Sequence, residues 1–79
     1  MAEKVFNVAA AWDAECRMWY VSHSDVPGLN TEAETLEALI DRVTAIAPEL
    51  LELNGLVPAA ARTFPVRVTA ERETVVSIN

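Results

Sequence analysis

The sequence contains few of the residues that build disulfide, metal and redox sites. Its single cysteine, Cys16, cannot form an intramolecular disulfide, and its single histidine is His23. These two side chains alone would leave a metal ion short of ligands, so we interpret Cys16 as a small apolar residue within a strand. The sequence has no HExxH, CxxC or phosphate-binding glycine loop. We therefore expect neither a metal nor a cofactor.

Positive charge is scarce. Six lysines and arginines stand against twelve aspartates and glutamates, which gives a net charge of −6 at pH 7. Because phosphate backbones are bound by clustered Lys and Arg, direct nucleic-acid binding is disfavoured. Residues 29–61 hold most of the imbalance, with Arg42 alone against six acidic residues, a net charge of −5. Such a segment either forms a solvated face or meets a basic partner, and both interpretations stay open.

Long apolar runs are also missing from the sequence. No stretch approaches the roughly 18 residues of a membrane-spanning helix, and the N-terminus lacks the charged and apolar regions of a signal peptide. We therefore expect a cytoplasmic protein that does not contact a membrane. Residues 1–79 can form one domain, which buries only about 60% of its unfolded surface. A second subunit is the expected way to enlarge so small a core.

Two alternating segments near the N-terminus predict a β-hairpin. In residues 5–12, every second position is Phe6, Val8, Ala10 or Trp12, and residues 16–22 resume the pattern after a short polar interruption. If the first set faces inward, Trp19 and Val21 are its natural partners. Cross-strand aromatics stabilise hairpins, so we interpret Trp12, Trp19 and Tyr20 as structural rather than as a ligand-stacking patch.

A turn and a helix follow the hairpin. Pro27 and Gly28 suit the two central positions of a type II turn, and residues 29–32 suffice for a brief strand antiparallel to the second. Thr31 and Thr35 compete as the helix N-cap, and we choose Thr35 because the apolar face begins one residue later. That face runs at three- and four-residue spacing through Leu36, Leu39, Ile40, Val43, Ile46, Ala47, Leu50 and Leu51.

Pro48 lies inside this helical pattern and would remove one backbone hydrogen bond. The apolar face continues through it without a change of phase, which predicts one kinked helix rather than two. Asn54 and Gly55 suit the end of the helix, since glycine accepts the left-handed conformation found there. We expect a core formed by Phe6, Val8, Ala10, Trp19, Val21, Leu36, Leu39, Ile40, Val43, Leu50, Val66 and Val68.

The C-terminal segment follows a small linker, residues 57–62, and alternates over residues 64–78. One strand of this length would span roughly 50 Å, too much for the sheet of a single subunit. Its far end would also leave apolar side chains on an unpaired edge. We therefore expect a homodimer joined through this strand, with either a parallel or an antiparallel placement. The expected interface residues are Thr74, Val76 and Ile78.

His23 is the one obvious acid–base candidate. A hydrolytic site would need a nucleophile, an orienting carboxylate and an oxyanion hole to converge on it. The adjacent serines, Ser22 and Ser24, point to the opposite face of an extended strand and are poorly placed for activation. We expect a surface or turn-packing histidine and no enzymatic activity, with a small hydrolase or nuclease as the alternative.

Several motifs carry a family resemblance. V-x-A-A-W-D, then M-W-Y-V-S-H-S-D-V-P-G-L-N-T-E-A-E-T-L-E-A-L-I, then P-E-L-L-E-L-N resemble a small bacterial family known only as a domain of unknown function. That family in turn resembles the N-terminal domain of HicB-type antitoxins over residues 5–45. The resemblance implies an α+β fold, a two-layer sandwich in β-β-β-α-β order, with one amphipathic helix on a small, mainly antiparallel sheet.

HicB-type antitoxins neutralise a small basic RNA-cleaving toxin and usually carry a further DNA-binding domain. We see no basic recognition helix here, so operator binding is not expected. By this resemblance we expect a non-catalytic binding module that engages a small basic, toxin-like protein. A structural dimer without any toxin partner is the remaining alternative. The candidate partner-binding residues are Glu34, Glu37, Asp41, Glu49 and Glu52.

Overall fold

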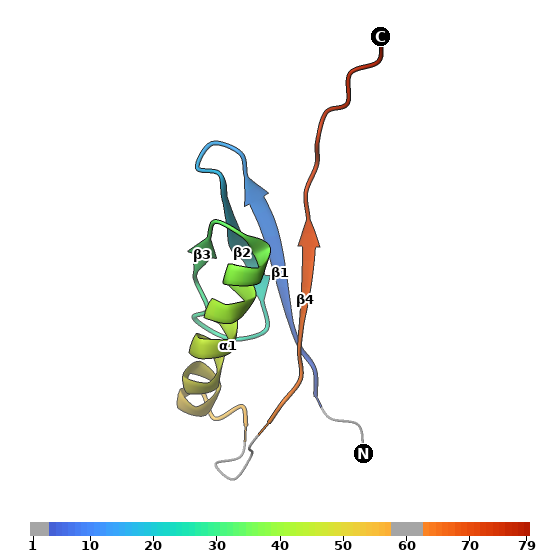
Figure 1. Ribbon diagram of the computed structural model, residues 1–79. Helices are drawn as coiled ribbons and strands as arrows, with labels where there is room; N and C mark the ends of the chain where they lie inside the picture. The colour runs from blue at the N-terminus through green and yellow to red at the C-terminus, as the bar shows by residue number, and fades with distance from the viewer. Residues whose placement is uncertain (1–3, 58–62) are drawn as a thin grey trace.

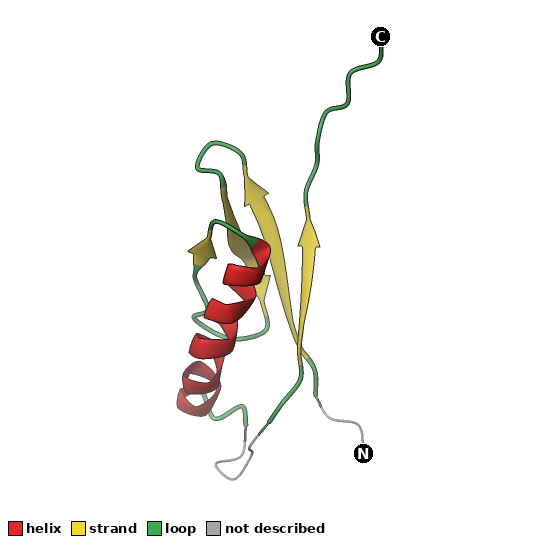
Figure 2. Ribbon diagram, viewed as in Figure 1, coloured by secondary structure: helices red, strands yellow, loops and turns green. Residues whose placement is uncertain are grey.

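The computed structural model describes residues 4–57 and 63–79 and has two layers (Figure 2). A four-stranded sheet forms one layer, in the order β3-β2-β1-β4, and one helix covers one of its faces. The predicted α+β fold and the β-β-β-α-β order are confirmed. The sheet is mixed, because two strand pairs are antiparallel and β1 with β4 is parallel. The elements are β1 (Phe6–Asp13), β2 (Met18–Ser24), β3 (Glu32–Ala33), α1 (Leu36–Leu53) and β4 (Val66–Glu71).

The hairpin of β1 and β2 contains a β-bulge. Ala10 is opposite Val21, but Ala9 is opposite His23, so Ser22 is an extra residue in β2. Such an insertion reverses the alternation of side chains beyond it. His23 therefore shares the outer face of the sheet with Ala9, and the half-buried Ser24 takes the inner face opposite Val8.

The predicted turn after β2 is confirmed. The N–H of Leu29 donates to the carbonyl of Val26 at 3.3 Å, and Gly28 has φ +79°, the positive value that a type II turn requires at this position. The chain then reaches β3, which pairs antiparallel with β2 as predicted. This strand is only two residues long, and it begins at Glu32 rather than at Leu29.

Both ends of α1 match the prediction. The Thr35 hydroxyl accepts from the N–H of Ala38 at 3.0 Å, which confirms it as the N-cap. At the other end, Leu56 N–H bonds the Leu51 carbonyl and Gly55 N–H bonds the Glu52 carbonyl, the pair of bonds that defines a Schellman motif. One helix runs through Pro48, as expected.

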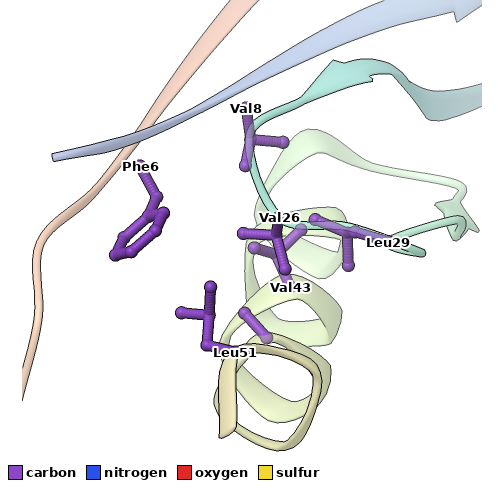
Figure 3. Packing of buried hydrophobic residues seen from close by; sticks show 7 residues of the cluster. Phe6, Val8, Val26, Leu29, Val43 and Leu51 are labelled. Carbon is purple, nitrogen blue, oxygen red and sulfur yellow. The ribbon is translucent and has the colours of Figure 1, made fainter. Parts of the chain in front are cut away.

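The core lies between α1 and the inner face of the sheet (Figure 3). Phe6, Val8, Ala10, Leu39 and Val43 are buried as predicted. The prediction was wrong for one core residue and missed a group of others. Ile40 is 38% exposed, because the helix turns the stripe of Leu39, Val43, Ala47 and Leu51 toward the sheet. The missed buried residues are Val26, Leu29, Ala33, Ala47 and Leu51.

The last strand is shorter than residues 64–78. β4 ends at Glu71, and residues 72–79 have no strand partner and are all exposed. Figure 1 shows them continuing past the end of the sheet, so that the molecule measures 58 Å along its longest axis. Most of the predicted linker, residues 58–62, lies outside the described residues.

Cys16 lies in the hairpin turn and is exposed, so its assignment to a strand was wrong. The Asp13 side chain accepts from the N–H groups of Glu15 and Cys16, and its carbonyl accepts from Arg17 N–H at 2.7 Å. These bonds favour a closed turn over a longer strand. Arg17 adopts φ +58°, which completes the reversal.

Candidate interaction surfaces

His23 is exposed on the outer face of the sheet, and the neighbouring hydroxyls are directed elsewhere. Ser22 Oγ donates to the carbonyl of Ala9 at 3.2 Å. Ser24 Oγ accepts from the N–H of Val26 at 2.9 Å. Backbone groups thus engage both serines that adjoin His23, so neither of these hydroxyls is free to act as its nucleophile.

Asp25, the carboxylate closest in sequence to His23, is also held by the backbone. Its Oδ2 accepts from Asn7 N–H at 2.8 Å and from Asn7 Nδ2 at 3.2 Å. The bond from the Asn7 backbone, followed by the bond from its side chain, lowers the pKa of Asp25 below its ordinary value. The positive charges of His23 and Lys4 add smaller contributions in the same direction. The arrangement ties the start of β1 to the end of β2.

The five candidate acidic residues are all exposed, but they do not form one cluster. Helical geometry places Glu37, Asp41 and Glu52 within about 60° around the axis of α1 and over about 22 Å of its length. We call these three residues the acidic row. Glu49 lies about 120° from Glu37 on the same helix, and Glu34 precedes the N-cap.

The acidic row runs beside an open groove of about 360 Å³ between α1 and β4. Ile40, Thr44 and Pro48, spaced four apart, form its helical rim. Among the described residues, the nine that line it carry no charge. The sequence pattern did not predict this groove, since Ile40 was assigned to the core. We call this the α1–β4 groove. Its other lining residues are Val43, Ala47, Thr63, Phe64, Val66 and Val68.

The candidate dimer residues Thr74, Val76 and Ile78 lie in the exposed C-terminal segment. We call residues 72–79 the tail. Within it, Val75 is 93% exposed, Val76 78% and Ile78 95%. These apolar side chains are therefore exposed in the single chain.

The described part of the chain offers neither a metal site nor a membrane-spanning helix. Residues 4–57 and 63–79 contain no group of three or more His, Cys, Asp or Glu side chains able to hold a metal ion. In the same ranges, no helix is both long enough and apolar enough to cross a bilayer.

The comparisons with known proteins give a family but no activity. The model of a domain of unknown function, DUF1902, matches residues 5–78. The chain belongs to the DUF1902 family. The expected membership of an unknown-function family is thereby confirmed, whereas the HicB part of the resemblance stays a prediction. No curated protein matches the chain.

A solved structure is similar to this DUF1902 chain over nearly its whole length. The chain is 38% identical to hypothetical protein TTHA1013 from the extremely thermophilic bacterium Thermus thermophilus. The match covers 95% of this chain and 100% of that one, with a TM-score of 0.68. The two proteins therefore share one fold over nearly their whole length.

Proposed function

We propose that this DUF1902 protein is a non-catalytic binding module that holds a small basic protein, as an antitoxin holds its toxin. The observation that carries the proposal is the outer side of α1, where Glu37, Asp41, Glu49 and Glu52 are all exposed. Leu53 follows Glu52 on the helix and is 75% exposed. An apolar anchor flanked by charge of one sign favours a partner of the opposite sign.

The electrostatics of α1 support a cationic partner. The last turn contains no basic residue, although Glu49 and Glu52 lie near the end where the helix dipole is negative. Glu37 and Asp41 are four residues apart, and like charges at this spacing destabilise a helix by about 0.2–0.5 kcal/mol. Lysines or arginines from a partner would relieve both repulsions. The isolated helix is therefore less stable than a bound one.

The fold is consistent with the resemblance to HicB-type antitoxins. That resemblance rests mainly on the turn at Val26–Leu29 and on the start of α1, and the β-β-β-α-β order is the fold that it implies. They support the antitoxin-like interpretation at the level of architecture. The acidic side chains of α1 supply the negative charge that would attract a basic partner.

The test is a pull-down from the native host with paired charge variants. The bait is the full chain, the variant Asp41→Lys with Glu52→Lys, or the control Glu15→Lys with Glu32→Lys, which changes the net charge equally. We expect wild type and control to retain the same basic protein, with retention falling as salt rises. With that protein purified, calorimetry should give a dissociation constant at least about tenfold weaker for the α1 variant. Equal binding by the α1 variant, or retention of an acidic protein, would contradict the proposal.

The enzymatic alternative has a separate test. Wild type and His23→Ala are assayed against single-stranded RNA and an activated ester. We expect no turnover above buffer from either protein, because the local hydroxyls are bonded to the backbone. Wild-type activity that disappears in the variant would favour the enzyme.

A further inference from the structure

We propose that two copies of the chain join edge to edge through β4 and the tail, and that the tail of each copy fills the α1–β4 groove of the other. This inference is independent of the proposed function, because it uses the edge of the sheet and the groove rather than the outer side of α1. The proposal adds to the predicted homodimer a register for the pairing of the two β4 strands and a groove in which each tail binds.

The free edge of β4 fixes which residues can pair. The carbonyl of Pro65 accepts from Phe6 N–H at 3.1 Å, and the register places Phe6 opposite Val66. In a parallel pair with this register, the odd-numbered residues of β4 bond to β1. The N–H and C=O groups of Val66, Val68 and Ala70 therefore point to the open side. A strand added there finds its bonding partners at even positions.

The inner face of the sheet imposes the same condition. Val66 and Val68 lie opposite Phe6 and Val8 and face the helix layer. Thr74, Val76 and Ile78 have the same parity. An antiparallel strand that places even residues opposite even residues also places these tail side chains on the inner face, beside the α1–β4 groove. The backbone hydrogen bonds and the side-chain directions thus favour the same registers, those that place even-numbered residues of one copy opposite even-numbered residues of the other.

The charged side chains reduce the number of registers that remain possible. Centring the two-fold axis on Glu71, Arg72 or Glu73 would place that side chain directly opposite its own copy, which is destabilising. Centring it on Ala70 avoids every such pair and brings Glu73 opposite Arg67 twice. A two-fold axis centred on Thr69 also avoids pairs of identical charged residues. In that register, however, Val76 would lie beyond Phe64 and outside the groove. Only the Ala70 centre places Val76 of the second copy opposite Phe64, a lining residue of the groove.

The result is an eight-stranded sheet with both helices on one face. Each tail buries Val76 and covers the rim at Ile40, which is 38% exposed in the single chain. The edge of β4, otherwise a template for unspecific pairing, is closed by the symmetric contact. Val75 has the opposite parity and stays on the outer face.

This parity gives the first experiment a matched control. Sedimentation equilibrium is carried out on the full chain, Val76→Asp and Val75→Asp. Both valines are exposed in the single chain, so both variants should fold, which circular dichroism checks. We expect a dimer for wild type and Val75→Asp, and a dissociation constant at least about tenfold weaker for Val76→Asp. A monomeric wild type, or equal weakening by the two variants, would overturn the proposal.

A cysteine series tests the register in the Cys16→Ser background. Ala70→Cys places the new thiol beside its own copy, at the roughly 5.5 Å Cα separation that a disulfide accepts. We expect this variant to cross-link under mild oxidation. Thr69→Cys and Glu71→Cys should do so poorly alone but readily when mixed, since these positions are opposite each other. Cross-linking of Thr69→Cys or Glu71→Cys alone in preference to Ala70→Cys would show that the register is wrong.

Discussion

The guanidinium carbon of Arg72 lies 4.2 Å from the centre of the Trp12 ring. Trp12 in turn packs edge-on against Trp19, with ring centres 5.6 Å apart. This contact holds the chain at the point where it leaves β4 and the tail begins. Trp12, considered with Trp19 as part of a possible ligand patch from the sequence, thus packs against an arginine of the same chain, and Trp19 supports it from the side.

Arg72→Ala should lower the free energy of unfolding by about 0.5–1 kcal/mol, the usual contribution of an exposed cation over an aromatic ring. It should also shift the fluorescence of the native state, since both tryptophans of the chain lie in this cluster. Urea denaturation followed by fluorescence measures both effects. Arg67→Ala, on the outer face of the same strand, is the control, and both variants are compared in the Val76→Asp background because Arg67 is opposite Glu73 in the proposed dimer. Equal losses from the two variants would show that the stacking contributes nothing.

Leu39→Ala and Ile40→Ala should differ although the residues are neighbours. Leu39 is fully buried, so its truncation should cost about 2–5 kcal/mol of unfolding free energy. Ile40 lies at the rim of the groove, and its truncation should cost under about 1 kcal/mol. Thermal and chemical denaturation in the Val76→Asp background exclude a contribution from dimer contacts. Similar losses at both positions would mean that the helix orientation is wrong.

Gly28→Ala should destabilise the fold by about 1–2 kcal/mol, because φ +79° is unfavourable for a residue with a Cβ atom. The new Cβ would lie 3.6 Å from Leu50 Cδ2, which is an ordinary contact. Gly55→Ala at φ +64°, with nothing within 4 Å, is the matched comparison. Similar losses at the two sites would assign the cost to the backbone, and a much larger loss at Gly28 would point to packing against Leu50.

Asp25→Asn should reduce the pH dependence of stability in acid. The pKa of Asp25 is lower in the folded protein than its ordinary value of 3.8, so the charged form is the one that folding favours. Its contribution is complete above about pH 5 and disappears as the pH falls through the folded-state pKa. The gap in denaturation midpoint between variant and wild type should therefore be smaller near pH 3 than at neutral pH. Asn7→Ala, which keeps the backbone donor, should have a smaller effect.

Local signals made much of the fold predictable. The turn at Pro27 and Gly28, the Thr35 cap and the end of α1 at Gly55 each depend on residues within a few positions of one another. Their chemistry is the same in a peptide as in a folded chain. The inward set of Phe6, Val8 and Ala10 followed from alternation alone.

The orientation of α1 was less predictable because its apolar face is wide. Leu39 and Ile40 both belong to it, and so do Leu50 and Leu51. The sheet covers only part of this wide apolar face, and tertiary packing decides which of its residues are buried. The choice of Ile40 was therefore wrong, and the omission of Leu51 left out a fully buried residue, whereas Leu50 is half-buried against the core.

The bulge at Ser22 and the parallel pairing of β4 depend on contacts that the sequence pattern does not show. Ser22 continues a regular alternation in the sequence, and only its position against β1 makes it an extra residue. The outer-face placement of His23 follows from this insertion. The negative charge of the acidic row could be predicted from the sequence. Its separation from Glu49 and Glu34 follows from the bounds and the geometry of α1.

The parallel pairing of β1 with β4 also determines the order in which the chain folds. Hairpin closure joins Asp13 to Met18, whereas the parallel pair joins Phe6 to Val66. The larger loop costs about 2 kcal/mol more in closure entropy, so we expect β1, β2 and α1 to assemble before β4 joins the sheet. During synthesis, we therefore expect β1 to keep one open edge until residues 66–71 have left the ribosome. A chain stalled before Val66 therefore presents that edge to its neighbours, and nascent copies held on one messenger are the ones at risk of pairing wrongly.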